Sequence, residues 1–429
     1  MARYAFQHGI IIDGTRAMEP LEGKAVLVND DRIEAIIDPS DIPSSCTCID
    51  LKGKYLLPGL INMHVYLAGN GGNGSPQKQR DNAKLVRLLF SNPLSAAAAH
   101  ALVASYAKTQ LMSGVTTIRT VGGLKDLDTR VRDEIAIGKQ VGPRILAANM
   151  AVSVPGGHMA GSVATESRSI EEAVEAASAA INERVDLVKV MITGGVLDAK
   201  EKGTPGEMKM WPEMVRAICK KAHAYGLPVA AHVESTKGVR VALQNGVDSV
   251  EHGAQPTEEI IDLFKSTGSS LTCTLSPTLP YALFDRTVSG ASEIEQYNGQ
   301  IVFEGIRDMA QAALDNGIPL ALGNDVGCPW ITQYDFWREL VYLTKFTTAT
   351  PQDALYAATL GGATCAGIDQ EAGSVEAGKC ADLIVVNDNP LENLTTLRNV
   401  EMVMTRGRLI EHPTVKRTPA IDAQLDRFL

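Results

Sequence analysis

Aromatic residues are scarce in this 429-residue chain, at 5% of the sequence. The sequence also lacks any apolar run near the ~18 residues that a membrane span needs, and residues 1–8 do not form the apolar core of a signal peptide. Seven cysteines occur without a Cys-x-x-Cys pair, and an odd number favours reduced thiols over a disulfide framework. These absences predict a cytoplasmic protein with no membrane partner.

Positive charge is also in short supply, with 40 lysines and arginines against 50 acidic residues and a net charge of −10. Because nucleic-acid binding depends on clustered lysine and arginine, and no basic stripe occurs, we expect no nucleic-acid partner. The 45% hydrophobic content and 38 glycines are typical of a globular protein with many tight turns. The length allows one large barrel with a small accessory domain, or two to three ordinary domains.

Strand-like runs alternate with helical patterns through the middle of the chain, as βα units require. Helical spacing is clearest over 169–182 and 211–225. Eight such strands over roughly 300 residues match a (β/α)₈ TIM barrel with insertions. The candidate strands are 59–66, 115–122, 144–151, 186–194, 228–234, 248–252, 269–275 and 318–325.

Both chain ends have a different pattern, in which short strands are separated by turns. We predict that the two ends join in a small β-sandwich beside the barrel, so that the chain is an α/β protein. The predicted domains are a β-sandwich from 1–57 plus 371–411, a barrel over 58–370 and a C-terminal tail over 412–429. The strands that support the sandwich are 9–14, 24–28, 31–37, 378–386 and 400–410.

The first barrel strand nearly ends in a metal site. Side chains two residues apart on a strand point the same way, so a His-x-His sequence would place two imidazoles on one side. Here His64 is followed at that spacing by Tyr66. A loop rich in glycine and asparagine is predicted over 69–74, and barrels of this kind hold their chemistry where strands open into such loops.

A lysine lies inside the otherwise apolar strand 186–194. Burying its ammonium costs several kcal/mol unless the charge is paired or neutralised. As a carbamylated lysine (N6-carboxylysine), Lys189 would be a carboxylate able to bridge two cations. Pairing with a nearby acid in the barrel core is the structural alternative.

Two histidines, His232 and His252, close strands that are one βα unit apart. In a barrel this spacing places both imidazoles at the same rim, close enough to share a metal. Asp325 ends the last strand, where a carboxylate can ligate a metal and accept a proton from water, unless it is only a helix N-cap. His158 follows the third strand on a turn, where it is either a donor to a substrate carbonyl or a surface residue.

Taken together, these residues resemble the metal-dependent amidohydrolase superfamily, in its imidazolonepropionase-like branch with Xaa-Pro dipeptidases and related carboxypeptidases. The segments that carry the resemblance are 58–61, 114–119, 156–158, 246–253 and 373–383. The resemblance implies that His64 and Asp325 hold one metal, that His232 and His252 hold a second, and that carbamylated Lys189 bridges them. It also implies a metal-activated hydroxide, a proton shuttle at Asp325 and a contact from His158 to the substrate carbonyl.

Tyr66 is the main departure from the family pattern, which has a second histidine there. Neutral phenol is a poor ligand because its pKa of ~10 disfavours the phenolate, although a cation can recruit the phenolate oxygen. We therefore expect one firmly bound divalent metal, Zn²⁺, at His232 and His252. The metal at His64 and Asp325 is expected to be partly occupied or absent.

The expected function is hydrolysis of an amide C–N bond in a small carboxylate-bearing substrate, such as a dipeptide or an N-acyl amino acid. One alternative is a cyclic amidase or a deaminase of a heterocycle. Another is a binder whose catalysis is impaired because Tyr66 replaces a ligand. Arg119, Tyr281 and Arg286 are candidate substrate contacts, and the branch that the chain resembles predicts a homo-oligomer.

Overall fold

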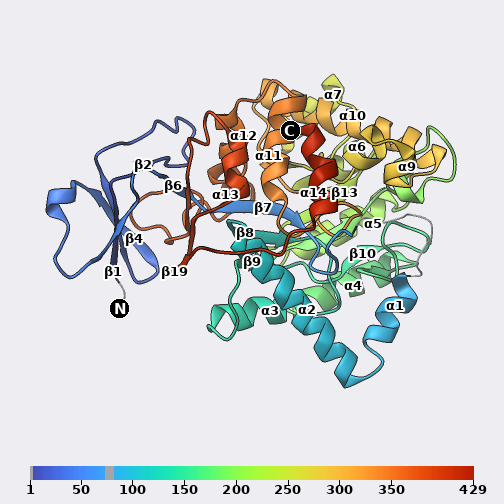
Figure 1. Cartoon of the computed structure of the whole chain (residues 1–429). Coiled ribbons are helices and arrows are strands. Elements are labelled where there is room, and N and C mark those ends of the chain that lie inside the picture. The colour runs from blue at the N-terminus through green and yellow to red at the C-terminus, as the bar shows by residue number, and fades with distance from the viewer. Residues whose placement is uncertain (1–2, 73–81) are drawn as a thin grey trace.

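Parallel strands fill the eight positions of a barrel in the computed structural model, which describes residues 3–72 and 82–429 (Figure 1). Neighbouring strands pair in parallel, and a bridge between Val65 and Val326 joins the first position to the last. The predicted barrel is confirmed, since each of the eight predicted runs contains one of its strands. The strands are β7 (Leu60–Val65), β8 (Val115–Thr120), β9 (Arg144–Leu146) with β10 (Ala151–Ser153) at the third position, β12 (Val188–Met191), β13 (Val229–Val233), β14 (Ser249–His252), β15 (Ser270–Cys273) and β16 (Leu320–Leu322).

Helices surround the barrel, and local signals set where two of them begin. The Ser169 side chain caps α4 by accepting a hydrogen bond from the Glu172 amide, and Pro212 opens α5, where its missing N–H costs nothing. The helices are α1 (Asn82–Leu89), α2 (Pro93–Met112), α3 (Leu127–Ala136), α4 (Ile170–Asn182), α5 (Pro212–His223), α6 (Thr236–Gln244), α7 (Glu258–Thr267), α8 (Leu279–Leu283), α9 (Arg286–Ser289), α10 (Glu293–Asn316), α11 (Phe336–Phe346), α12 (Pro351–Ala357) and α13 (Leu360–Cys365).

No single helix within residues 3–72 and 82–429 is long and apolar enough to cross a membrane. Only the pair α1 and α2, bent by 111° at the break between them, passes that test when the two are taken together. In the predicted loop 69–74, Asn73 and Gly74 lie outside the described residues.

A small β-sandwich built from both chain ends lies beside the barrel (Figure 1). One sheet, in the order β4-β3-β1-β5, is entirely N-terminal, whereas the other, in the order β19-β18-β17-β6-β2, joins two N-terminal strands to three C-terminal ones. Buried apolar side chains from both sheets form one core. This part of the predicted fold is confirmed, while the exact domain boundaries stay a prediction. The strands are β1 (Arg3–Gln7), β2 (Ile10–Ile11), β3 (Ala25–Asn29), β4 (Arg32–Ile37), β5 (Thr47–Asp50), β6 (Tyr55–Pro58), β17 (Leu383–Val386), β18 (Met402–Thr405) and β19 (Arg408–Glu411); β11 (Ala164–Glu166) pairs with β10 instead.

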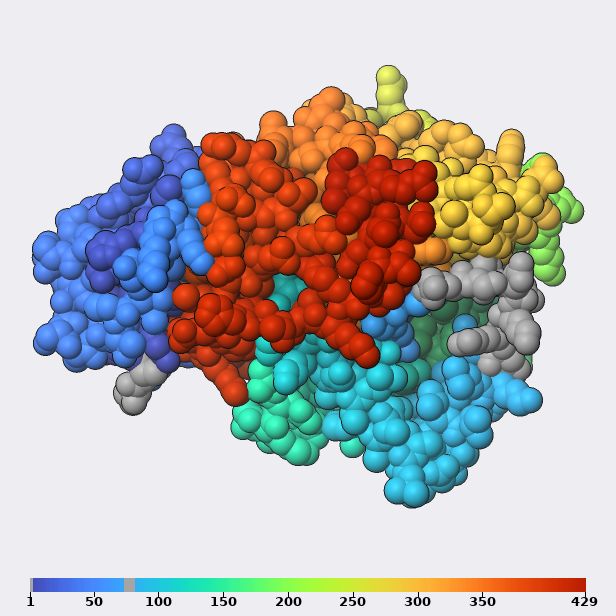
Figure 2. Space-filling model, viewed as in Figure 1, coloured from blue at the N-terminus to red at the C-terminus, as the bar shows by residue number. Residues whose placement is uncertain are grey.

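The C-terminal tail folds back onto its own barrel through α14 (Pro419–Leu425) (Figure 2). The guanidinium of Arg338, on α11, is buried and makes ion pairs with Asp335 at 3.2 Å, Asp422 at 3.2 Å and Asp426 at 2.6 Å. We call these four residues the C-terminal clamp. The clamp ties the last residues of the chain to a helix of the barrel.

Candidate metal centre

His64 is the penultimate residue of β7, at the carboxyl-terminal rim of the barrel, and is fully buried. Its Nδ1 lies 2.7 Å from Oε2 of Glu251. The other carboxylate oxygen of Glu251 accepts hydrogen bonds from Arg119 at 2.6 Å and from Ser249 at 2.6 Å. The buried carboxylate therefore fixes the His64 ring so that Nε2 is the nitrogen left for a ligand.

Asp325 follows β16. Its Oδ1 lies 3.4 Å from His64 Nε2, the ring nitrogen that does not contact Glu251. Its backbone has a φ of 51°, which a non-glycine residue rarely adopts. Burial alone would raise the pKa of Asp325, but the neighbouring His64, His252 and Lys189 hold it below its ordinary value. The side chain is thus an ionised carboxylate facing three nitrogen-bearing groups.

Lys189 is fully buried on β12, as the sequence predicts. Within the described part of the chain its Nζ has no hydrogen-bond partner. Burial lowers the pKa of Lys189 to about 8, against the opposing attraction of Glu251. The structural alternative of a direct salt bridge is therefore not what the structure shows.

His232 and His252 lie on adjacent strands, with their ring centroids 4.7 Å apart. The Nδ1 of His252 is hydrogen-bonded to Thr274 Oγ1 at 2.7 Å, which leaves Nε2 free for a ligand. Among the described residues, His232 Nε2 has no hydrogen-bond partner. Burial lowers the pKa of both histidines well below the ordinary value, so both rings are neutral and carry the lone pair that a metal needs.

His158 is not an isolated surface residue. Its ring stacks on His232 with centroids 3.9 Å apart and planes 2° from parallel, and Asp198 holds its Nδ1 at 2.6 Å. The turn after the third strand thus places a histidine directly against the metal-ligand candidates.

Tyr66 is buried beside His64, with the two ring centroids 5.7 Å apart. One edge of the ring packs on Gly122, where an added Cβ would lie 2.5 Å from Tyr66 Cε1. Burial and the charge of Asp325 raise the pKa of the Tyr66 hydroxyl well above its ordinary value. The neutral phenol is therefore strongly favoured, as expected for a poor metal ligand.

An apolar cavity of about 200 Å³ adjoins Tyr66 at the same rim. The cavity adjoins the candidate ligands, because its wall includes Met159, which follows His158, and Gly327 and Cys328, which lie shortly after Asp325. Its lining includes Val86, Leu124, Met159, Val163 and Cys328.

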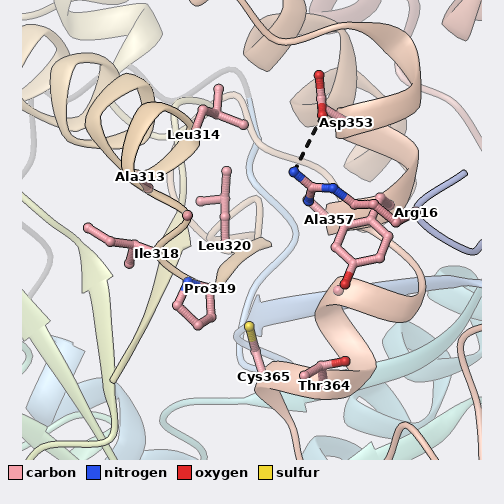
Figure 3. Close-up of a pocket in the computed structure, with 13 residues that line it drawn as sticks. Arg16, Ala313, Leu314, Ile318, Pro319, Leu320, Asp353, Ala357, Thr364 and Cys365 are labelled. Atoms are coloured by element: carbon pink, nitrogen blue, oxygen red, sulfur yellow. Dashed lines mark ion pairs between the residues drawn. The ribbon is translucent and has the colours of Figure 1, made fainter. Parts of the chain in front are cut away.

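A larger cavity, of about 350 Å³, lies at the opposite end of the barrel (Figure 3). Its wall includes Pro319 and Leu320, at the start of β16, whereas Asp325 follows the end of that strand. Arg16 lies at this cavity and pairs with Asp353 at 4.0 Å. This cavity is therefore remote from the histidine cluster.

Two groups of side chains could each hold a cation, with donor atoms within 4.8 Å of one another. One group is His64, His252 and Asp325, and the other is His232, Glu234 and His252. Imidazole nitrogens and carboxylate oxygens are the ligands of Zn²⁺ and related divalent metals. The donor set and its unpartnered buried atoms fit such a metal.

Sequence reasoning missed Glu251 and Glu234. Arg119, predicted as a substrate contact, is instead buried and bonded to Glu251, so that prediction is wrong. Arg286 is exposed on α9 and donates to the Ala291 carbonyl, which gives it no visible role at the rim. Tyr281 is buried, and its hydroxyl has no partner in the residues that the structure describes.

A closed parallel barrel with chemistry-bearing side chains at its carboxyl-terminal rim defines an α/β-barrel enzyme. The family is also clear, because the amidohydrolase profile matches residues 55–410. The chain belongs to the amidohydrolase family, which confirms the resemblance stated above. It is a hydrolase of the kind that acts on C–N bonds.

Solved structures and curated proteins resemble this chain over nearly its whole length. A Bifidobacterium longum structure, provisionally assigned as a prolidase, is 35% identical, with 99% of this chain and 98% of that chain covered and a TM-score of 0.87. A Xaa-Pro dipeptidase with bound methionine in its active site is 27% identical, with 96% and 100% covered and a TM-score of 0.83. Ochratoxinase from Aspergillus niger is 24% identical over 95% of this chain and 86% of its own length.

Proposed function

We propose that this amidohydrolase uses a divalent metal to cleave the amide bond of a small carboxylate-bearing substrate, such as a dipeptide or an N-acyl amino acid. One observation carries the proposal. His64, Lys189, His232, His252 and Asp325 lie on or just after five barrel strands and converge on one rim, and all but His252 have a buried donor atom that lacks a hydrogen-bond partner in the described structure.

The apolar cavity beside Tyr66 supports a substrate with an apolar group next to the scissile amide. Its volume of about 200 Å³ suits an amino-acid side chain or a single ring. The Xaa-Pro dipeptidase that this chain resembles holds methionine in its active site, which is an apolar amino acid with a free carboxylate. Ochratoxinase and prolidase relatives support the amide bond as the target.

The residues of the rim divide the chemistry among themselves. His64, His232, His252, Asp325 and a carbamylated Lys189 would hold the metal. When bound, a divalent cation supplies polarisation of the substrate carbonyl and activation of water. The unpartnered Nζ of Lys189, buried in the described structure without a salt bridge, supports its conversion to a carboxylate.

Asp325 and His158 handle the proton and the carbonyl in this proposal. The Asp325 carboxylate accepts the proton that water loses and returns it to the leaving nitrogen. Because Nδ1 of His158 is bonded to Asp198, its Nε2 is the atom that faces the substrate carbonyl oxygen.

A substrate panel tests the proposal. Protein supplied with Zn²⁺ or Mn²⁺ is assayed for amine release from apolar dipeptides and N-acyl amino acids, each paired with the same compound carrying a blocked carboxylate. We expect turnover of the free carboxylates and little turnover of the blocked forms. Uniform inactivity contradicts the proposal, and ring-opened or deaminated products from cyclic substrates would favour a cyclic amidase or a deaminase.

Restoring histidine at position 66 separates an impaired enzyme from a binder. In Tyr66→His we expect a second equivalent of metal and at least tenfold higher activity, because a neutral imidazole is a far better ligand than a neutral phenol. Metal per chain by elemental analysis and kcat/KM are measured together. Two tightly held equivalents in the unaltered protein would contradict the one-metal expectation.

A further inference from the structure

Glu234 is an acidic residue at the rim that the proposed function does not yet use. It lies two residues after His232, just beyond the end of β13, and its carboxylate lies within 4.8 Å of ligand atoms of His232 and His252. Oε2 of Glu234 is buried and has no hydrogen-bond partner among the residues described. The Val196 backbone hydrogen-bonds to the carboxylate but brings no opposite charge, and a buried carboxylate is costly, by several kcal/mol, unless a cation or a proton neutralises it.

Space around Glu234 is kept open by a glycine. A Cβ on Gly195 would lie 3.4 Å from Glu234 Oε2 and 3.1 Å from His158 Cε1. The stacked pair of His158 and His232 holds the neighbouring imidazole in a fixed plane. The carboxylate and the His232 ring are therefore presented together to one small volume.

The two candidate cation groups compete for His252, which belongs to both. Because its Nδ1 is bonded to Thr274, His252 has one nitrogen to give, and it can complete only one three-ligand set. His64 and Asp325 already face each other at 3.4 Å. In contrast, His232 Nε2 and Glu234 Oε2 have neither a hydrogen bond nor an ion pair within the described structure.

We propose that Glu234 is a metal ligand, and that with His232 and His252 it forms the one tight divalent-cation site of this chain. The inference rests on the proposed function for the presence of a metal and adds a ligand to it. A tetrahedral Zn²⁺ with bonds of about 2.0–2.2 Å needs donors roughly 3.4 Å apart. The three donors lie within 4.8 Å of one another, so small side-chain rotations complete the site.

Charge also favours this set. Two neutral imidazoles compensate none of the charge of a buried divalent cation, whereas the Glu234 carboxylate removes one unit of it, in addition to the unit that a carbamylated Lys189 would remove.

Zn²⁺ titration against a competing chromogenic chelator tests the proposal on the full chain. In Glu234→Ala we expect the Kd for Zn²⁺ to rise by roughly 100-fold or more, beyond the roughly 10–100-fold of an outer-shell partner. Glu207→Ala is the control: its loop pairs with Gly194 beside the rim, and it removes the same charge from outside the cluster. This control should bind Zn²⁺ like the unaltered protein.

Thermal unfolding of the metal-free proteins shows whether Glu234 is merely structural. We expect the metal-free Tm of Glu234→Ala to stay level or rise, because the variant removes a buried carboxylate that has no opposite charge beside it. If that variant fails to fold, Glu234→Gln keeps the shape without the charge and should show the same loss of Zn²⁺.

The outcomes separate the inference from the proposed function. Tight Zn²⁺ binding that Glu234→Ala and Glu234→Gln both retain overturns the inference alone. An unaltered protein that binds no Zn²⁺ overturns both. Weak binding in the Glu234 variants with normal binding in Glu207→Ala establishes the ligand.

Discussion

The C-terminal clamp and the candidate metal centre are both clusters of buried charge, yet they satisfy their charges differently. In the clamp, one guanidinium reaches three carboxylates of the same chain, at 2.6 to 3.2 Å. In the metal centre, buried atoms of Lys189, His232, Glu234 and Asp325 face one another without hydrogen-bond partners in the described chain. A cluster whose charges pair with one another stabilises the fold. A cluster whose charges lack partners within the polypeptide instead indicates a site for a ligand that the polypeptide does not supply.

The largest expected effect is on catalysis, and it comes from the ligand that both cation groups share. In His252→Ala, kcat/KM should fall by at least 10³-fold, about 4 kcal/mol of transition-state stabilisation. Metal per chain should fall with it, while the metal-free protein loses less than ~2 kcal/mol of unfolding free energy. If the variant retained its metal and activity, His252 would not be a metal ligand, and the contrast between the metal centre and the clamp would fail.

The clamp should show the opposite response. In Arg338→Met, Asp335 loses its ion-pair partner, and Asp422 and Asp426 keep only the more exposed Arg398 and Arg417, which costs about 3–5 kcal/mol of stability. Denaturant unfolding should report that loss, with metal content unchanged in the folded protein. Arg240→Met is the matched control, because Arg240 pairs with Glu259 at the surface, where such pairs contribute about 1 kcal/mol or less. Equal effects from both arginines would contradict the structural role of the clamp.

A smaller effect on metal binding is expected at Glu251, which shares a feature with each cluster. Glu251 is paired to Arg119, as in the clamp, but it also orients a candidate metal ligand. Glu251→Gln should weaken any metal held at His64 by roughly 10–100-fold, as for other outer-shell partners of histidine ligands. This weakening is measured as a fall in metal bound per chain in the double variant Tyr66→His/Glu251→Gln relative to Tyr66→His. Glu339→Gln is the control, since this buried glutamate binds the backbone at Leu275 and Ser276.

The barrel could be predicted because alternation of strands and helices is a local signal. The third strand shows the limit: the prediction over 144–151 is two strands, β9 and β10. Asn149 breaks the run with a φ of 53°, and its side chain accepts a hydrogen bond from the Thr129 amide, which opens α3. That partner is 20 residues away in sequence, so no pattern near Asn149 reveals it.

The site was predictable to the same degree. Histidines and an aspartate at strand ends point to the rim, and Lys189 stands out as a charge in an apolar strand. Glu251 sends the same signal within β14, and Glu234 stands at the same-side spacing that singles out Tyr66, so both could have been found. The partners were not predictable, because the contact between His64 and Glu251 joins residues 187 apart.

Asp128 sharpens the comparison, because it is unpaired and buried but belongs to no cluster. Its carboxylate has no ion pair in the described structure, where only the Thr120 hydroxyl opposes the effect of burial, and neither candidate cation group includes it. With no cation to neutralise it, the side chain takes up a proton instead: burial raises the pKa of Asp128 to about 7.

A raised pKa for an acid means that the folded protein holds the proton that the unfolded chain releases near pH 4, so stability falls as the pH rises from about 4 to about 7. Asp128→Asn removes that dependence. The variant should match the unaltered protein at pH 4 and be more stable at pH 8, by on the order of 4 kcal/mol. Urea unfolding at both pH values measures the difference. A stabilisation independent of pH would mean that the Asp128 carboxylate is neutralised by an opposite charge rather than by a proton. A buried oxygen without an ion pair would then be a weaker sign of a missing ligand than the metal centre suggests.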